Sequence, residues 1–139
     1  MRVRKAEFGF RGTPLRATLV AAILRGEKTA TAGLVVDYER DGDELPQVGE
    51  RFVVVDNDDR GVAIIETTEM RVLRVGDCDV EFARDEGEGF ESVAEWRAGH
   101  DRYWRGYADE IRAYLGDPEW DVSDETEFVA ERFRLVEVL

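Results

Sequence analysis

The sequence predicts an α+β protein in which a small, mostly antiparallel β-barrel is flanked by two or three helices. The first observation is a pair of strand-like segments, 51–56 and 62–75, separated by the turn-forming residues 57–61, which is typical of an antiparallel hairpin. The second is that most strands follow one another without the helical crossovers that parallel sheets need. At this length the whole chain, 1–139, is expected to form one domain.

The beginning of the chain predicts a short strand or extended arm followed by a helix. Residues 1–10 alternate poorly between apolar and polar types. The helix is predicted over 14–25, because Thr13 is a suitable N-cap and Pro14 fits the first helical position. Gly26 fits the residue just past its end.

Two more strands complete the predicted barrel. The segment 34–39 is predicted to be a strand, and the closing segment 127–139 is predicted to be the last one. The apolar alternation of the closing segment slips at Val136, which indicates a bulge or a sheet buried on both faces. In the second hairpin strand, Glu66 and Glu69 are three residues apart, so regular alternation would place them on opposite faces.

A long helical pattern lies between the hairpin and the closing strand. Ser92 followed by Glu95 is a capping box at its start, and Gly116 marks its end. Gly99 and Gly106 weaken the helix interior, which allows a kink or a break.

Composition restricts the partners of this protein. The formal net charge is −13, with 19 Lys and Arg against 32 Asp and Glu. Long nucleic acids are held by an excess of Lys and Arg, so extended duplex DNA is not expected, whereas a small neutral ligand or a short single-stranded RNA fits. With one Cys and one His, no structural zinc site and no cofactor are predicted. Since there is no long apolar run and no signal-like N-terminus, we expect a cytoplasmic protein without a membrane partner.

The segment GEKTAT, residues 26–31, combines a hydroxyl nucleophile with a basic side chain. A threonine hydroxyl is a weak nucleophile at neutral pH and needs a nearby base. A lysine can be that base when burial lowers its pKa, and lysine–hydroxyl pairs are a known form of acyl-transfer machinery. Lys28 and Thr31 can converge if the segment is a tight turn. A solvated loop lysine beside a strand threonine explains the same residues without any chemistry.

Two further groups of residues are candidates for a site. The segment FARDEGEGF, 82–90, places several carboxylates around two glycines, and a carboxylate held there can orient a lysine or accept a proton. An acidic solvated turn explains it equally. His100 shares a helical face with Trp96, where a packed core histidine is the ordinary role, and Trp104 can stack a base or fill the core.

Taken together and in order, these motifs resemble the ASCH domain, a PUA-like β-barrel family, over nearly the whole chain. The resemblance implies a five- or six-stranded barrel flanked by helices, with a cleft where the GEKTAT turn meets the barrel mouth. The matching segments are 24–34, 46–73, 82–89, 96–104 and 131–136.

One branch of the family resembles small amidohydrolases that remove the acetyl group from N4-acetylcytidine. This resemblance implies Lys28, Thr31 and Glu86 as catalytic residues and a modified nucleoside as substrate. Relatives often have a serine where this chain has Gly33 and commonly an aspartate where it has Phe90. The expected substrate-binding residues are Thr29, Arg25, Glu88, Trp96, Arg97, His100 and Trp104.

Two alternatives remain open at this point. Another branch of the family is linked to RNA binding and to metal-assisted ribonuclease action, for which Mg²⁺ or Mn²⁺ would be needed. A non-catalytic sensor of a nucleoside or RNA would keep the cleft without turnover. No oligomeric state is predicted. The arginines and lysine that would line a local RNA groove are Arg11, Arg25, Lys28, Arg97 and Arg102.

Overall fold

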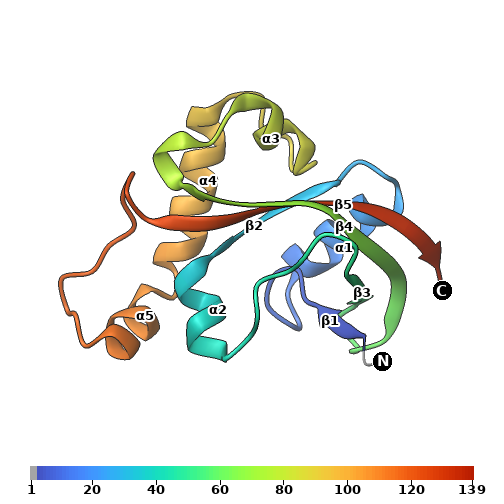
Figure 1. The fold of residues 1–139 in the computed structure, drawn as a ribbon, viewed down its shortest axis with the longest axis horizontal. Helices are drawn as coiled ribbons and strands as arrows, with labels where there is room; N and C mark the ends of the chain where they lie inside the picture. Colours follow the sequence, from blue (N-terminus) through green and yellow to red (C-terminus); the bar gives the residue numbers. More distant parts are fainter. Residues whose placement is uncertain (1–2) are drawn as a thin grey trace.

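The computed structural model describes residues 3–139, and its centre is a curled, five-stranded half-barrel sheet with the order β1-β3-β4-β5-β2 (Figure 1). The β1–β3 pair is parallel, whereas the other pairs are antiparallel. The predicted α+β fold class and mostly antiparallel, barrel-like sheet are therefore confirmed, with the sheet curled into a half-barrel. The N-terminal arm contains the predicted short strand, and residues 1–2 lie outside the described part. The strands are β1 (Arg4–Ala6), β2 (Ala30–Leu34), β3 (Arg51–Val55), β4 (Gly61–Arg74) and β5 (Glu127–Val138).

The described residues form five α-helices and one 3₁₀ helix, more than the two or three helices predicted. The difference comes from two short helices, α2 and α3, which lack the long apolar periodicity that reveals a helix in a sequence. No helix among these residues has the length and apolar character needed to cross a membrane. The helices are α1 (Pro14–Leu24), α2 (Val35–Asp41), η1 (Val75–Asp77), α3 (Val80–Asp85), α4 (Val93–Arg105) and α5 (Ala108–Leu115).

The helix ends follow the predicted capping signals. The Thr13 hydroxyl accepts a hydrogen bond from the backbone N–H of Arg16 at 3.3 Å, and Ser92 accepts one from that of Glu95 at 3.1 Å. The long helical segment is broken after Gly106, which separates α4 from α5. Glycine therefore ended α4 at one of the two positions where the sequence allowed a break.

The predicted strand over 34–39 is wrong, because this segment is helix α2 and the strand before it is β2. β-branched valines at the start of the segment suggested a strand. A contact distant in sequence favours the helix instead, since the Tyr107 hydroxyl donates to the Asp37 carboxylate. Gly42, with φ of 69°, then ends the helix in the left-handed region that glycine adopts readily.

Strand β5 contains the bulge that its sequence indicated. Ile64 pairs with Glu137, but the next residue, Ile65, pairs with Leu135. Val136 is therefore the extra residue, which confirms the predicted irregularity at this position.

A second bulge, at Thr68, corrects the expected orientation of two glutamates. Glu66 pairs with Arg134, and Glu69 pairs with Arg132 two residues earlier on β5. Because Arg134 and Arg132 share one face of the strand, Glu66 and Glu69 also lie on the same face rather than on opposite ones.

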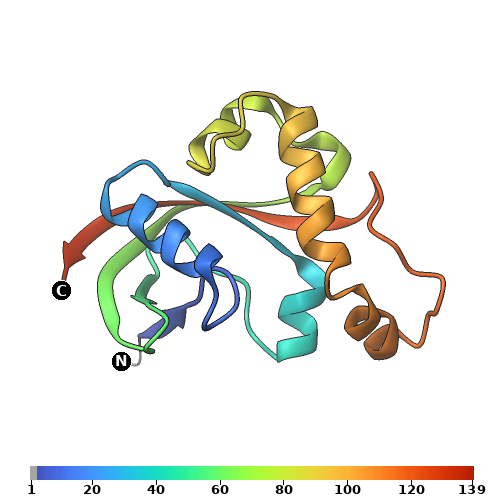
Figure 2. The same ribbon diagram turned by 180° about the vertical axis from the view of Figure 1, so that it is seen from behind.

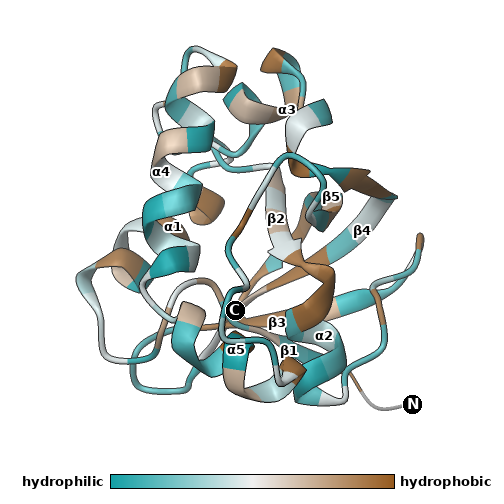
Figure 3. Cartoon of the chain, turned by 90° about the vertical axis from the view of Figure 1, so that its left-hand side faces the viewer, coloured by the Kyte–Doolittle hydropathy of each residue, from teal (hydrophilic) through white to brown (hydrophobic). Residues whose placement is uncertain are grey.

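Two hydrophobic cores lie on opposite faces of the sheet. Figures 1 and 2 show how the helices are arranged around that sheet. The first is formed with α3, α4 and α5, and includes Leu34, Trp96, Trp104 and Phe128. The second is formed with α1 and the N-terminal arm, and includes Phe8, Leu19, Ile65 and Phe133. Figure 3 shows hydrophobic residues on the strands and mostly hydrophilic ones over α2.

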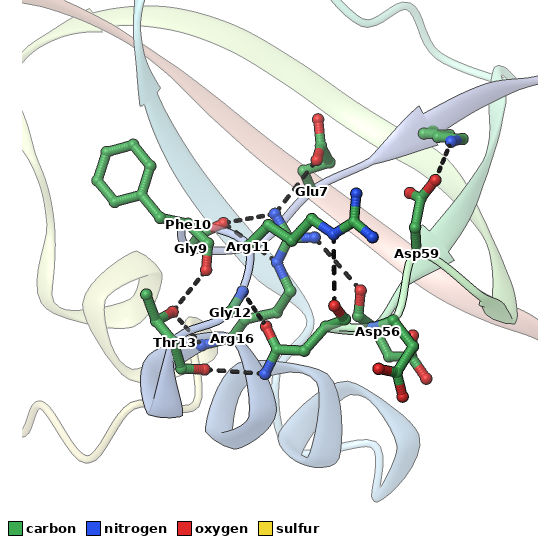
Figure 4. Close-up of polar contacts among 12 residues, drawn as sticks. Glu7, Gly9, Phe10, Arg11, Gly12, Thr13, Arg16, Asp56 and Asp59 are labelled. Carbon is green, nitrogen blue, oxygen red and sulfur yellow. Dashed lines mark hydrogen bonds and ion pairs between the residues drawn. The ribbon is translucent and has the colours of Figure 1, made fainter.

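The arm that leads into α1 is held in place by a buried arginine (Figure 4). Arg16, only 2% exposed, donates to the carbonyl oxygen of Gly9 at 2.9 Å, to the Glu7 carboxylate at 3.2 Å and to the carbonyl oxygen of Asp56 at 3.4 Å. Asn57 accepts from the backbone N–H of Gly12 at 2.7 Å. These bonds fix residues 7–12 as one wall of the cleft described next.

Candidate functional site

A cleft of about 670 Å³ opens between the N-terminal arm, α1, β2, the loop after α3 and helix α4. Its walls are aromatic and its rim carries several arginines, a composition that suits a planar polar ligand. The aromatic residues are Phe8, Phe10, Phe90, Tyr103, Trp104 and Tyr107, and the cationic ones are Arg11, Arg16, Lys28, Arg40 and Arg102.

Lys28 lies at the inner end of this cleft and is only 2% exposed. Its ammonium group donates to the carbonyl oxygen of Ala30 at 2.8 Å, to that of Glu86 at 3.2 Å and to the Glu88 carboxylate at 3.2 Å. An ammonium group has three protons and no acceptor lone pair. Each proton of Lys28 therefore has a partner, and the side chain carries a positive charge into the cleft.

Gly87 allows the loop after α3 to reach the GEKTAT turn. Its φ of +67° favours glycine, and a Cβ at this position would lie 2.4 Å from the carbonyl oxygen of Glu27 and 2.7 Å from the Cα of Lys28. The backbone N–H of Thr29 donates to the carbonyl oxygen of Asp85 at 2.9 Å, which joins the two segments. The close approach brings the Glu88 carboxylate and the main-chain carbonyl oxygen of Glu86 to the buried lysine.

Glu86 is fully buried, and its carboxylate binds the helix α4 side of the site rather than Lys28. Its Oε2 accepts from Trp96 Nε1 at 2.8 Å and lies 3.1 Å from His100 Nε2. The other oxygen, Oε1, has no hydrogen-bond partner among the described residues. The sequence suggested Glu86 as the carboxylate that holds Lys28, but in the structure Glu88 occupies that place and Glu86 contributes its main-chain carbonyl.

His100 is positioned as an imidazolium. Its Nδ1 lies 3.0 Å from the carbonyl oxygen of Trp96, and its Nε2 faces Glu86. Both partners are acceptors only, so both ring nitrogens are suited to carry protons. Burial alone would lower the pKa of His100, but the hydrogen bond to Glu86 and the negative charges of Glu86 and Glu88 raise it above its ordinary value.

The same side chains provide donor atoms that suit a metal ion. Glu86, Glu88 and His100 each offer one ligand atom, and these atoms lie within 4.8 Å of one another. Carboxylates and imidazole together are typical ligands of Mn²⁺ or Zn²⁺. As arranged, however, His100 and the Lys28 ammonium already contact the two carboxylates. A metal ion would have to separate Glu86 from His100 and compete with the ammonium group for Glu88.

Thr31 lines the cleft from strand β2, on the face opposite to its neighbour Ala30, which packs in the core beside α4. Because Thr31 is in an extended strand, it does not converge with Lys28 in a turn, and no hydrogen bond joins the two within residues 3–139. Across the sheet, Thr31 pairs with Glu131 of β5.

The remaining predicted residues divide between the cleft and other parts of the surface or core. His100 and Trp104 line the cleft, whereas Trp96 is fully buried in the core and reaches the site only through Glu86. Arg25 and Arg97 are outside the cleft and pair with nearby carboxylates. Thr29, half-buried, donates its hydroxyl to the carbonyl oxygen of Asp85.

Several lining residues were not singled out as site residues from the sequence. Phe10 is 52% exposed and stacks on Tyr103 with ring centroids 5.5 Å apart. The ring of Tyr107 meets the Phe10 ring edge-on, with centroids 5.6 Å apart. Tyr103 and Tyr107 share a helical face with His100, and this spacing was the signal in the sequence that could have identified them. Phe10 gave no such signal, because the apolar residues of its arm follow no regular spacing.

Phe90 and Gly33 are the two positions where this chain departs from the family pattern. At both, a non-polar residue stands where relatives often have a polar one. Phe90 lines the cleft and packs on Gly99, where an added Cβ would lie 2.8 Å from the ring. Gly33 faces the ring of Tyr38, and an added Cβ would lie 3.2 Å from it. The cleft is thus narrowed by an aromatic side chain at one position and kept free of side-chain atoms at the other.

Comparison with known proteins finds the same fold elsewhere. The ASCH domain family model matches residues 6–137. A protein of Enterococcus faecalis V583 from family model DUF984 is similar with a TM-score of 0.83 and 22% identity, over 99% of this chain and 78% of that one. The ASCH domain from Lactobacillus crispatus JV V101 is similar with a TM-score of 0.76 and 28% identity, over 96% of this chain and 79% of that one. No curated protein matches this chain.

Proposed function

The chain belongs to the ASCH domain family, which suggests an RNA-binding or hydrolase-like role, and we propose that its cleft is the active site of an amidohydrolase. The substrate would be an N4-acylated cytidine or a related modified nucleoside. Such a ligand is planar, polar and neutral, so the aromatic walls suit it and the net charge of −13 does not repel it.

The observation that carries this proposal is the presence of a buried ammonium group and a hydroxyl group in one cleft. Amide hydrolysis needs a nucleophile and a group that stabilises the negative oxygen formed in the transition state. Thr31 offers the hydroxyl and Lys28 the positive charge, and both line the cleft. A charge acts more strongly at such a buried position than in water.

In the proposed reaction, the Thr31 hydroxyl attacks the acyl carbonyl and the ammonium of Lys28 stabilises the oxyanion. The amine of the base leaves, and water then releases the acid from the acylated threonine. Lys28 was predicted from the sequence to be the base. Because its three protons are all donated to acceptors, the structure supports an electrostatic role instead.

Recognition of the base is supported by the free oxygen of Glu86. This buried atom has no donor within the described residues, and an unpaired buried acceptor is costly. An N–H group of a nucleobase bound between the aromatic walls would satisfy it. A ligand without such a donor would leave this oxygen unpaired and should therefore bind less well.

The test is incubation of the protein with N4-acetylcytidine, with release of acetate and cytidine measured. We expect turnover by the wild-type protein and a loss of about 10²-fold or more for Lys28→Met, which keeps an unbranched side chain, one atom shorter, but removes its charge. Thr31→Val, which keeps the shape of the side chain, is expected to abolish turnover. Absence of turnover by the wild-type protein would contradict the proposal, and binding without turnover would identify a ligand sensor.

A second candidate function is RNA binding, with or without cleavage. Arg11 and Arg102 line the cleft, and neither has an ion-pair partner in the described part of this acidic protein. Arginines without ion-pair partners at a cleft rim are suited to phosphate groups. A short single-stranded RNA with Mg²⁺ or Mn²⁺ tests this function, since binding should weaken steeply with added salt. No binding at low salt would contradict it.

A further inference from the structure

The proposed reaction leaves one proton without an acceptor. The Thr31 hydroxyl must lose its proton as it attacks, and a threonine needs a nearby base for this. Lys28 already donates three hydrogen bonds, and Glu86 is turned toward Trp96 and His100. Glu88 is paired with Lys28. A carboxylate beside Thr31 on the same face of the sheet would be placed to take this proton.

Glu131 lies directly opposite Thr31 in the antiparallel β2–β5 pair. Side chains of residues paired in this way point to the same face, with Cβ atoms about 4.5–5.5 Å apart. Both residues also line a second hollow of about 270 Å³, which shares Thr31 and Phe8 with the main cleft. The carboxylate and the hydroxyl thus face the same space.

Glu131 is also a buried carboxylate without a cationic partner. It is only 7% exposed, and within residues 3–139 it forms no ion pair. Its one hydrogen bond is from the Thr67 hydroxyl to Oε2, at 2.6 Å. Burial raises the pKa of Glu131, while the nearby charges of Arg4 and Lys28 act to lower it and that of Glu50 to raise it. A raised pKa makes a carboxylate a better proton acceptor.

We propose that Glu131 is the general base that removes the proton from Thr31, an inference that depends on the proposed amidohydrolase function. As Thr31 Oγ bonds to the acyl carbon, its proton passes to the Glu131 carboxylate. When the carbon–nitrogen bond breaks, Glu131 returns that proton to the leaving nitrogen. In the second half, Glu131 takes a proton from the attacking water and returns it to Thr31 Oγ as the ester bond breaks.

The first test compares Glu131→Gln with the wild-type protein on N4-acetylcytidine. Glutamine keeps an oxygen that can accept from Thr67 but cannot take a proton. We expect kcat to fall by about 10²- to 10⁴-fold with KM little changed. Glu137→Gln is the matched control, because it removes one carboxylate from an exposed position of the same strand, and it should retain full activity.

A second measurement separates failure of this inference from failure of the proposed function. Acetylation of Thr31 by p-nitrophenyl acetate, located by mass spectrometry of peptides, needs the base but not the nucleoside. We expect acetylation in the wild-type protein, none in Thr31→Val and a strong loss in Glu131→Gln. If the wild-type protein acetylates Thr31 but spares N4-acetylcytidine, only the substrate assignment fails.

Other outcomes overturn the assignment of Glu131. Wild-type rates in folded Glu131→Gln would do so, as would the absence of Thr31 acetylation in the wild-type protein. If Glu131→Gln does not fold, Glu131→Asp takes its place, since it keeps the charge but withdraws the carboxylate by about 1.5 Å, one carbon–carbon bond. An unchanged rate in that variant would also overturn the proposal.

Discussion

Two buried carboxylates lie beside the cleft, and they differ in how their charge is compensated. Glu86 accepts from the Trp96 indole and faces an imidazolium, while the neighbouring Glu88 pairs with Lys28. Glu131 has a single hydroxyl donor and no ion pair within the described residues. Burial alone therefore does not define the role of a carboxylate. The compensated site is suited to hold its shape, and the uncompensated one to exchange a proton.

The strongest test of this difference is to make the same change at Glu86. Glu86→Gln removes the charge that compensates the His100 imidazolium, and breaking a buried ion pair costs about 3–5 kcal/mol. We therefore expect the free energy of unfolding at pH 6 to fall by about 3 kcal/mol in chemical denaturation. A loss near zero would show that Glu86 and His100 share a single proton rather than opposite charges.

At Glu131 the same substitution, glutamate to glutamine, should have the opposite effect on stability. An unpaired buried carboxylate costs stability when it is ionised, so Glu131→Gln is expected to raise the free energy of unfolding by about 1–2 kcal/mol at pH 7.5. This direction follows from the raised pKa of Glu131 in the folded protein. The contribution of Glu131 to stability is favourable below its pKa in the unfolded chain. That contribution is lost as the pH rises through its pKa in the folded protein. Thermal unfolding of the wild-type protein and the variant measures the difference. A variant less stable than the wild-type protein would contradict the prediction.

The smallest expected effect is a pH dependence that originates at His100. Its pKa is raised in the folded protein, so its contribution to stability is complete below about 6.5 and is lost as pH rises through the folded-state pKa. His100→Gln should flatten this part of the stability profile above pH 6. An identical slope in the variant and the wild-type protein would assign the dependence to other groups.

The sequence predicted much of the fold because the relevant signals are local. The cap at Thr13, the break after Gly106 and the bulge at Val136 each depend on a few neighbouring residues. The segment 34–39 was misassigned because its helix is favoured by a tyrosine 70 positions away along the chain. The bulge at Thr68 left no mark on the apolar pattern, so the orientation of nearby residues was not predictable.

The candidate site was predictable only in its parts. The sequence indicated Lys28 and a carboxylate-rich loop, but the bond from Lys28 to Glu88 spans 60 residues and depends on the close approach at Gly87. Glu131 follows the buried residues Phe128–Ala130, but its strand also contains Arg132, Arg134 and Glu137, so its charge alone gave no distinctive signal. Its meaning depended on the β2–β5 register, which opposes it to Thr31. Which strands become neighbours is a property of the whole sheet, and no short motif specifies it.

The packing of Phe90 on Gly99 links two positions that evolution and protein engineering would otherwise treat as independent. A side chain at 99 needs the ring at 90 to be withdrawn, since its first carbon would lie 2.8 Å from that ring. Replacement of Phe90 by aspartate would open room at 99 and place a polar group at the edge of the cleft. Libraries that aim to change ligand choice should therefore vary residues 90 and 99 as a pair, because a side chain at 99 requires the Phe90 ring to move.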